Sequence, residues 1–208
     1  MPDLGRLIAF EGGEGAGKST QSRALATHIG AELTREPGGT PLGERLRRLL
    51  LEETGPLDPR AELMLLLAAR AEHLAERIGP ALAAGRHVVV DRFTASTLAY
   101  QGYGRGLPIE EVRRACALAT GGREPDLNVL LDVPVPLGAA RRSPRSEDRI
   151  EREEAEFHER VRRGFLAEAA AAPERWLVVD GSLAEAEVGA SVKSGVAARL
   201  GILPKAAG

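Results

Sequence analysis

The sequence predicts an α/β fold in which a parallel sheet is covered by helices on both faces. Short, continuous apolar runs, typical of strands buried on both sides, occur at residues 7–10, 88–90, 129–131 and 176–179. Longer segments with helical spacing of their apolar residues separate these runs. Strands that alternate with helices are typical of parallel sheets joined by right-handed crossovers.

The first apolar run is followed by glycines and then by a helical segment at 21–29. Further helices are expected over residues 60–78, 109–119 and 151–171. Open parallel sheets bind ligands beyond the carboxyl ends of their strands. We therefore expect a site at the residues that end the four predicted strands, which are Gly12, Asp91, Asp132 and Asp180.

Length and composition limit the classes of protein that fit. The 208 residues suit a single domain, 1–208, although two very small domains have the same total length. With 43% hydrophobic and 28% charged residues, the chain has a globular composition. Its net charge of −2 argues against a surface committed to nucleic acid. Neither a leader nor a stretch long enough to span a bilayer is evident, so we expect a cytoplasmic protein without a membrane partner.

A glycine-rich segment directly after the first strand carries the strongest functional signal. It reads GGEGAGKS and fits the P-loop pattern G-x-x-x-x-G-K-[ST], with the expected strand before it and helix after it. Its backbone N–H groups and the helix dipole would hold the polyphosphate of ATP. Lys18 would bridge the β- and γ-phosphates, and Ser19 would bind Mg²⁺. The alternative is a glycine-rich turn without a ligand. The predicted nucleotide-binding residues are Gly12, Gly13, Glu14, Gly15, Ala16, Gly17, Lys18, Ser19 and Thr20.

A second phosphate site is predicted at Asp91 and Arg92, where another strand ends in a carboxylate beside a cation. Asp91 could hold Mg²⁺ through water, and Arg92 could bind a phosphate bidentately. A structural ion pair at the strand end is the alternative.

Residues 141–150 are predicted to form a small arginine-bearing lid. Small and flexible residues between arginines suit a segment that closes over phosphates and excludes water. The alternative is a solvated basic loop, because the chain has 25 Arg and only 3 Lys. Arg149 is the preferred catalytic member, and Arg145 is assigned to ATP. The arginines of this segment are Arg141, Arg142, Arg145 and Arg149.

Other classes fit less well. A regulatory GTPase would need an N-K-x-D motif, which is absent, and the strand ending at Asp132 continues as Val-Pro-Val instead of D-x-x-G. A partition-type ATPase would not explain two phosphate sites and a lid. The single cysteine and the spacing of the four histidines give no zinc site. The features together suit a kinase of small phosphorylated molecules.

Four stretches together resemble the thymidylate kinase family: residues 10–21 (FEGGEGAGKSTQ), 34–40 (TREPGGT), 91–102 (DRFTASTLAYQG) and 148–151 (DRIE). The resemblance implies phosphorylation of dTMP to dTDP with ATP and Mg²⁺, in dTTP synthesis, by a homodimer. Another specificity among nucleoside monophosphate kinases, for dUMP or for pyrimidines more broadly, remains the alternative, followed by a P-loop ATPase that is not a kinase.

The resemblance also implies roles for individual residues. Glu14 would lie near the 3′-hydroxyl of the acceptor, Arg92 on its 5′-phosphate and Arg70 on a thymine carbonyl. Tyr100 would crowd the 2′ position. The other substrate residues that it implies are Thr97 and Gln101 on the base edge, and Ser96, Arg35, Glu36, Arg47 and Leu66.

Two positions mark the branch that the chain resembles. Gly15 stands where another branch carries a catalytic arginine, so the positive charge would come from the lid arginines. Leu66 stands where the family usually has a phenylalanine that stacks on thymine. A leucine keeps an apolar face but loses the flat stack.

Overall fold

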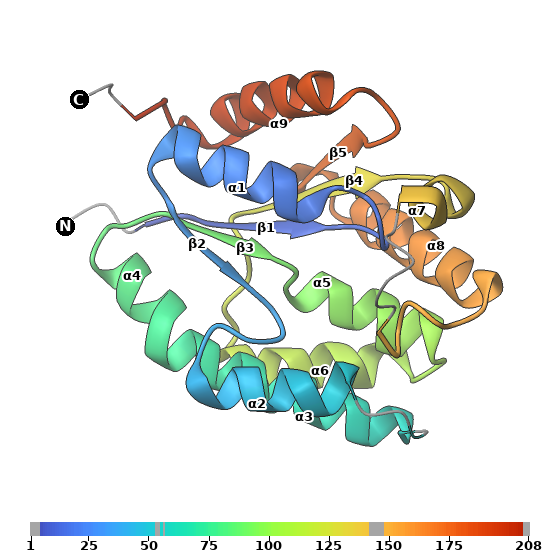
Figure 1. Cartoon of the computed structure of the whole chain (residues 1–208). Helices are drawn as coiled ribbons and strands as arrows, with labels where there is room; N and C mark the ends of the chain where they lie inside the picture. The colour runs from blue at the N-terminus through green and yellow to red at the C-terminus, as the bar shows by residue number, and fades with distance from the viewer. Residues whose placement is uncertain (1–4, 53–54, 56, 142–147, 206–208) are drawn as a thin grey trace.

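The computed structural model describes residues 5–52, 55, 57–141 and 148–205. Its centre is a five-stranded sheet with the order β2-β3-β1-β4-β5, and every neighbouring pair is parallel (Figure 1). The predicted parallel sheet is therefore confirmed. The strands are β1 (Leu7–Glu11), β2 (Glu32–Arg35), β3 (Val88–Asp91), β4 (Leu127–Asp132) and β5 (Trp176–Asp180).

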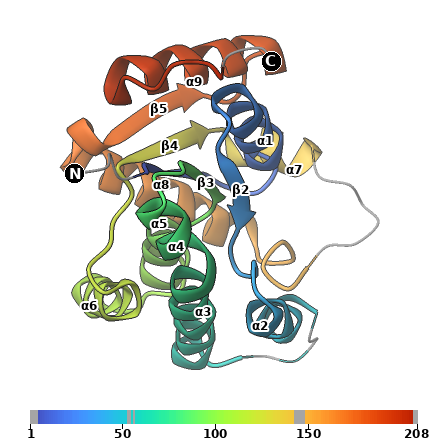
Figure 2. The same cartoon turned by 90° about the vertical axis from the view of Figure 1, so that its left-hand side faces the viewer.

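Helices cover both faces of the sheet. Helices α1 and α9 lie together on one face, and the other long helices lie on the opposite face (Figures 1 and 2). The helical elements are α1 (Lys18–Ile29), α2 (Pro41–Leu51), α3 (Pro59–His73), π-helical η1 (Leu74–Ile78), α4 (Gly79–Ala83), α5 (Thr94–Thr97), π-helical η2 (Leu98–Gly104), α6 (Ile109–Thr120), α7 (Val135–Arg141), α8 (Ala155–Ala171), the 3₁₀ turn η3 (Pro173–Arg175) and α9 (Glu185–Leu200).

Alternation of side chains along β1 explains why its first four residues are all apolar. Ile8 and Phe10 pack in one core with Leu25 of α1, whereas Leu7 and Ala9 pack in a second core on the opposite face. All five of these residues are buried. Successive side chains of a strand point to opposite faces, so a strand covered on both sides is apolar wherever its side chains enter these two cores.

The strand register aligns the carboxyl ends at one edge of the sheet. Phe10 of β1 is opposite Asp91 of β3, and Arg35 of β2 is opposite Asp91 from the other side. The chain leaves β1 directly into the glycine-rich segment, so that segment and Asp91 become neighbours. Two of the four predicted strand ends, at Gly12 and Asp91, therefore meet at one edge of the sheet.

The structure corrects several predicted boundaries. Residues 32–35 form the edge strand β2, which is not among the four predicted strands, because four residues of mixed polarity give no strand pattern. Helix α8 begins at Ala155 instead of residue 151, because Asp148 Oδ1 accepts hydrogen bonds from the backbone N–H groups of Ile150 and Glu151 and closes a turn there. Residues 142–147 of the predicted lid lie outside the described residues.

Helix α2 had a readable start signal. Thr40 accepts a hydrogen bond from the backbone N–H of Gly43 at 2.9 Å, and Pro41 occupies the first helical position. Both are common at helix N-termini.

In the part of the chain that the structure describes, no helix combines the length and hydropathy needed to cross a membrane.

Replacement of Leu25 by alanine is expected to lower the free energy of unfolding by about 2–5 kcal/mol, because it leaves a cavity between α1 and the sheet. Leu203→Ala, at a side chain that is 76% exposed, is the matched control and should change this free energy by less than about 0.5 kcal/mol. Urea denaturation of both variants measures the difference. Equal effects of the two substitutions would contradict the described core.

Candidate active site

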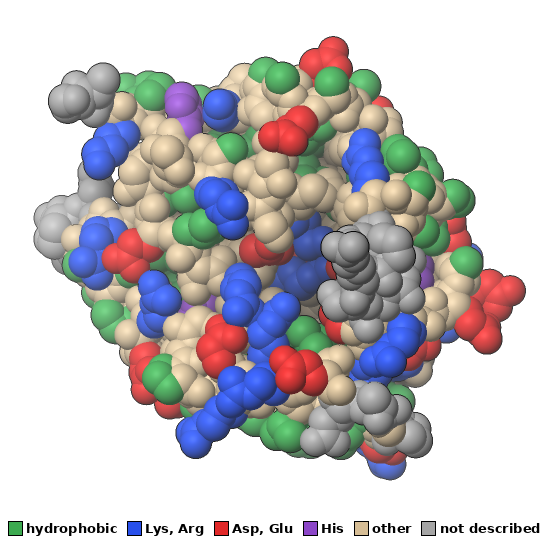
Figure 3. All heavy atoms as spheres, in the orientation of Figure 1, with side chains coloured by type: hydrophobic (Ala, Val, Ile, Leu, Met, Phe, Trp, Pro, Cys, Tyr) green, Lys and Arg blue, Asp and Glu red, His purple; other side chains and the backbone are tan. Residues whose placement is uncertain are grey.

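A cavity of about 770 Å³ opens at the carboxyl edge of the sheet. On the face shown in Figure 3, lysine and arginine side chains gather around a hollow. Gly12 and Gly13 do not line the cavity directly, and Arg145 lies outside the described residues. The predicted site residues that line it are Glu14, Gly15, Ala16, Gly17, Lys18, Ser19, Thr20, Arg35, Glu36, Arg47, Leu66, Arg70, Asp91, Arg92, Ser96, Thr97, Tyr100, Gln101 and Arg149.

The glycine-rich segment curls closely over the end of the sheet. Gly12 has φ 142°, and a Cβ there would lie 2.6 Å from the carbonyl oxygen of Leu131. Lys18 is the first residue of α1 and donates a hydrogen bond from Nζ to the carbonyl oxygen of Gly13 at 2.7 Å. Burial, and then the positive charge of Arg92, lower the pKa of Lys18 to about 8. The negative charge of a polyphosphate would oppose both effects and raise this pKa.

Position 15 excludes any side chain. Gly15 has φ 72°, and a Cβ there would collide with the backbone of Gly138 in α7. This close contact gives a physical reason for the absence of an arginine at Gly15, so positive charge must reach the cavity from other elements.

Ser19 and Asp91 place two hard oxygen donors side by side. The Ser19 hydroxyl donates to Asp91 Oδ2 at 2.6 Å. Hydroxyl and carboxylate oxygens are the ligands that Mg²⁺ prefers, and it usually keeps several waters and binds substrate phosphates as well. The pair therefore fits a magnesium ion held together with a nucleotide. Among the described residues, no group of three or more His, Cys, Asp or Glu side chains is arranged to hold a metal ion.

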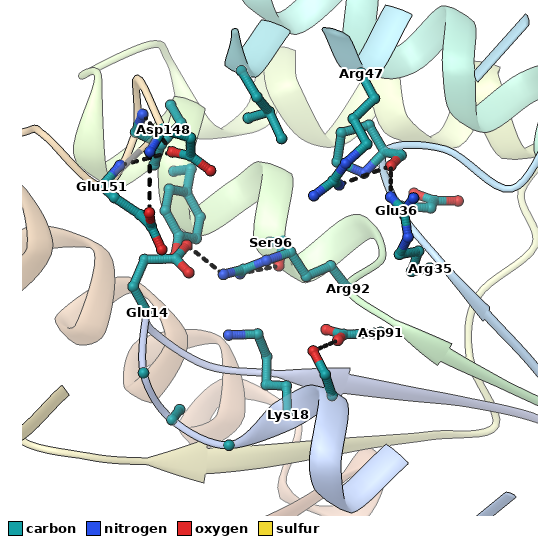
Figure 4. Close-up of a pocket in the computed structure, with 18 of the residues that line it drawn as sticks. Glu14, Lys18, Arg35, Glu36, Arg47, Asp91, Arg92, Ser96, Asp148 and Glu151 are labelled. Atoms are coloured by element: carbon teal, nitrogen blue, oxygen red, sulfur yellow. Dashed lines mark hydrogen bonds and ion pairs between the residues drawn. The ribbon is translucent and has the colours of Figure 1, made fainter. Parts of the chain in front are cut away.

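The Arg92 side chain extends from the end of β3 to the P-loop (Figure 4). Its Nη1 donates to the carbonyl oxygen of Gly12 at 3.1 Å and to Ser96 Oγ at 3.2 Å, and its Nη2 pairs with Glu14 Oε1. The guanidinium also lies over the Tyr100 ring, 5.0 Å from its centre. The Tyr100 hydroxyl donates to the same Glu14 oxygen at 2.8 Å. Arg92 is thus bound on several sides within the substrate-free protein.

The charges of this cluster fix its protonation states. Burial would raise the pKa of Glu14, but Arg92 and then Lys18 outweigh it and hold that pKa at about 2. Burial would likewise lower the pKa of Arg92, but Glu14 and Tyr100 keep it above its ordinary value. Glu14 is therefore a carboxylate, and Arg92 a cation, at any physiological pH.

A second, fully buried carboxylate supports Arg92 from behind. Glu11, the last residue of β1, accepts hydrogen bonds from the Ser96 hydroxyl at 2.5 Å and from the backbone N–H of Phe93 at 2.9 Å. Burial raises the pKa of Glu11. Through Ser96 and Phe93, this side chain fixes the turn on which Arg92 stands.

One face of α3 forms the opposite wall. Glu62, Leu66 and Arg70 follow one another at four-residue spacing, and all three line the cavity. Arg70 is buried, with Nε donating to Glu36 Oε2 at 2.6 Å and Nη1 donating to Thr97 Oγ1 at 2.9 Å. Leu66 and Arg70 therefore share one face of α3.

The loop after β2 closes the wall beside Arg70. Arg35 pairs with Glu44 at 3.0 Å, and Arg47 Nη1 donates to the carbonyl oxygen of Pro37 at 3.0 Å (Figure 4). Burial, and then the charge of Arg35, lower the pKa of Arg47. Glu44 and Asp148 offset these two effects only in part, and the hydrogen bond of Arg47 goes to an uncharged backbone oxygen, so an anion would stabilise it.

Arg149 lies on the α3 side of the cavity. Its Nε donates to the carbonyl oxygen of Leu50 at 3.0 Å, and its Nη2 pairs with Glu62 Oε2 at 2.6 Å. Its predicted action on the transferring phosphate stays a prediction. Arg141, at the end of α7, donates instead to the carbonyl oxygen of Gly181 at 2.7 Å.

The chain matches known proteins over most of its length. A family model described as thymidylate kinase matches residues 10–192. A thymidylate kinase of Synechococcus sp. (strain JA-2-3B'a(2-13)) is 52% identical, with 93% of this chain and 95% of the relative covered. One of Desulfovibrio desulfuricans is 50% identical, with 93% and 96% covered. The crystal structure of thymidylate kinase from Ehrlichia chaffeensis superposes with a TM-score of 0.77 at 34% identity, covering 93% of this chain and 99% of that one.

The chain belongs to the thymidylate kinase family. The predicted fold class is confirmed by this membership, because the parallel sheet with its P-loop matches a solved thymidylate kinase. Two of the strand-end residues nevertheless take no part in the cavity of this family member. Asp132 is bound by Arg162 through two hydrogen bonds of 2.7 and 2.9 Å, and Asp180 accepts from Ser182.

Three buried residues of this thymidylate kinase family member were not predicted to belong to the site. Glu62 had a readable signal, because it precedes Leu66 by one helical turn and so shares the face of α3 that carries Arg70. For Glu11, the only signal in the sequence was its place in the FEGG stretch at residues 10–13. His73, one of the four histidines without zinc-site spacing, is a buried core residue whose Nδ1 lies 3.0 Å from Glu36 Oε1.

Binding of ADP at pH 8.5 is expected to take up protons, because phosphate raises the lowered pKa of Lys18 while the nucleotide phosphates are already ionised. With a pKa of about 8 in the free protein, uptake should approach roughly 0.75 proton for each ADP, and affinity should fall as the pH rises through this value. Calorimetry in two buffers of different ionisation enthalpy measures it. Lys18→Met should abolish the uptake, and equal uptake in that variant would assign it to another group.

Proposed function

We propose that this member of the thymidylate kinase family transfers the γ-phosphoryl group of ATP to dTMP, producing dTDP and ADP for dTTP synthesis. One observation carries the proposal: a single cavity joins the P-loop at one end to the Arg92 guanidinium and the Leu66–Arg70 face at the other. Two phosphate groups that meet between Lys18 and Arg92 would be in position to react.

In the proposed reaction, an oxygen of the dTMP phosphate attacks the γ-phosphorus in line. The bond between that phosphorus and the β–γ bridging oxygen breaks, and ADP leaves. Lys18 and Arg92 share the negative charge of the transferring group, and Arg149 contributes charge from the opposite side. Positioning and electrostatic stabilisation supply the catalysis, since no side chain needs to form a covalent bond.

Mg²⁺ belongs to the proposed reaction through Ser19 and Asp91, whose hydrogen-bonded oxygens fit it. When bound, the ion would neutralise charge on the nucleotide phosphates. Ser19 would supply a hydroxyl ligand from the first turn of α1, and Asp91 would hold the ion through water. Arg145 stays a proposed ATP contact on the resemblance alone.

Recognition of dTMP is assigned to the far end of the cavity. Glu14 and Tyr100, which share a hydrogen bond of 2.8 Å, would meet the sugar and disfavour a 2′-hydroxyl. Arg70, with Thr97 and Gln101, would bind the edge of the thymine, and Leu66 would cover its face. Arg35, Glu36, Arg47 and Ser96 complete this proposed acceptor site.

We also propose a homodimer and a cytoplasmic location. The dimer follows from the family resemblance, and exposed apolar side chains on two neighbouring helices support it: Met64 of α3 is 68% exposed and Leu118 of α6 is 86% exposed. Equilibrium sedimentation would show twice the chain mass if the dimer forms. The location follows from the two proposed substrates, which are soluble cytoplasmic nucleotides.

The proposed function is tested by ADP release across dTMP, dUMP, dCMP, GMP and CMP at a fixed ATP concentration. We expect the highest kcat/KM for dTMP. Activity on ribonucleotides without activity on dTMP would reject the assignment while leaving the fold intact. A preference for dUMP would instead assign the chain a broader pyrimidine specificity, in agreement with Leu66 at the base face.

Lys18→Ala is expected to keep the fold and lose most of kcat, because the P-loop backbone still binds nucleotide while the cation on the transferring oxygens is gone. Steady-state kinetics and thermal unfolding of the same preparation separate the two effects. A normal kcat would remove Lys18 from the mechanism.

Arg149→Ala is expected to lower kcat far more than it raises the Kd of dTMP, because the proposed charge acts when the γ-phosphoryl group moves. Direct calorimetric titration of dTMP, beside steady-state kcat, distinguishes the two quantities. If only dTMP binding weakens, Arg149 belongs to the acceptor site, as its contact with Glu62 would then suggest.

Leu66→Phe is expected to tighten dTMP binding roughly two- to tenfold, since an aromatic ring on the face shared with Arg70 can stack on thymine for about 0.5–1.5 kcal/mol beyond area burial. Leu66 lines the cavity and is partly exposed there, which leaves room for the larger ring. Calorimetry on both forms measures the change. Unchanged affinity at unchanged stability would mean that Leu66 does not face the base.

A further inference from the structure

Glu62 is a buried carboxylate to which the reaction proposed above assigns no role. It lies in the first turn of α3, is 1% exposed, and lines the cavity at the Leu66–Arg70 face. Its Oε1 accepts hydrogen bonds from Gln101 Nε2 at 2.7 Å and Arg105 Nε at 3.3 Å. Its Oε2 accepts from Arg105 Nη2 at 3.3 Å and pairs with Arg149 Nη2 at 2.6 Å.

These donors keep Glu62 ionised. Burial alone would raise the pKa of Glu62, but the hydrogen bond from Gln101 and then the charge of Arg105 hold it below its ordinary value. Arg105 is itself fixed by an ion pair with Glu153 at 2.5 Å and by the Phe157 ring 4.7 Å away. An ionised carboxylate can only accept hydrogen bonds.

The orientation of the Gln101 amide follows from this. Only Nε2 can face Glu62, because the opposite orientation would set Oε1 against a carboxylate oxygen and leave a buried donor unmatched. Gln101 is 2% exposed and lines the cavity. Its Oε1 is therefore the amide acceptor that remains for a ligand, beside the N–H donors of Arg70.

The Arg70 donors beside the Gln101 Oε1 acceptor match the hydrogen-bonding edge of only some pyrimidine bases. Thymine and uracil carry a carbonyl at C4 and an N–H at N3, whereas cytosine carries an amino group and a ring-nitrogen lone pair at those positions. The N3 atom of cytosine and Gln101 Oε1 are both hydrogen-bond acceptors, so their lone pairs would face each other and repel. Cytosine would bind only if the Gln101 amide rotated and presented Nε2 as a donor.

We propose that Glu62 is a specificity-determining positioning residue, which locks the Gln101 amide so that its oxygen selects bases with an N3–H, thymine and uracil, over cytosine. This inference rests on the proposed function. It predicts that Glu62 affects the choice between substrates, and not only the stability of the fold or the overall rate.

The test compares kcat/KM for dTMP and dCMP in four proteins. Glu62→Gln replaces the obligatory acceptor by an amide that can also donate, so Gln101 can turn. The ratio of kcat/KM for dTMP to that for dCMP should fall about tenfold to a hundredfold. Because Arg149 also loses its carboxylate, kcat should fall for both substrates, and the ratio isolates the effect on the base.

Glu153→Gln is the matched control. It removes a carboxylate from the same Arg105 but does not contact Gln101, so the ratio should stay at its wild-type value. The exchanged pair Glu62→Gln with Gln101→Glu keeps one amide and one carboxylate between the two positions. Residue 101 then offers only acceptors to the cavity, and the preference for dTMP over dCMP should return.

The outcomes separate the two proposals. A wild-type enzyme that does not phosphorylate dTMP rejects the proposed function before any variant is measured. A wild-type ratio near one, or a wild-type ratio retained in folded Glu62→Gln, overturns the role of Glu62. If Glu62→Gln fails to fold, the exchanged pair decides: a preference for dTMP supports the lock, and its loss overturns it.

Discussion

The guanidinium of Arg92 joins the P-loop to the segment that follows β3, and the geometry of the site depends on it. Arg92 is the only non-glycine residue with positive φ in the described part of the chain, at 70°, a conformation that costs of order 1–3 kcal/mol. Its N–H donates to the carbonyl oxygen of Phe10 at 2.9 Å, and its side chain reaches Gly12, Ser96 and Glu14. The backbone is thus held where the side chain spans from β3 to the P-loop.

Charge pairing explains how so many arginines coexist around one cavity. A buried charge without a partner is costly, so the protein itself places a carboxylate beside three of these arginines. Incoming phosphates and base carbonyls can then join or replace these contacts without a large rearrangement of the side chains. The pairs are Arg92 with Glu14, Arg70 with Glu36, and Arg149 with Glu62.

The parts that could be predicted from sequence are those with a local cause. The P-loop has fixed spacing, and strands covered on both faces are continuously apolar, so both were correct. β2 was missed because its four residues carry no pattern. The contact between Glu62 and Gln101 joins residues 39 positions apart, and it forms only because α3 packs beside η2. Periodicity places Glu62 on the correct face of α3 but does not identify the amide it meets.

The most direct measurement of the central claim is kcat/KM for dTMP in Arg92→Lys. Lysine keeps the positive charge but cannot bind Gly12, Ser96, Glu14 and a phosphate through one planar fork. The account predicts a fall of about a hundredfold or more, with thermal stability close to that of the wild type. A kcat/KM equal to the wild-type value would show that charge alone suffices there, and would contradict the account of a cavity organised by the Arg92 guanidinium.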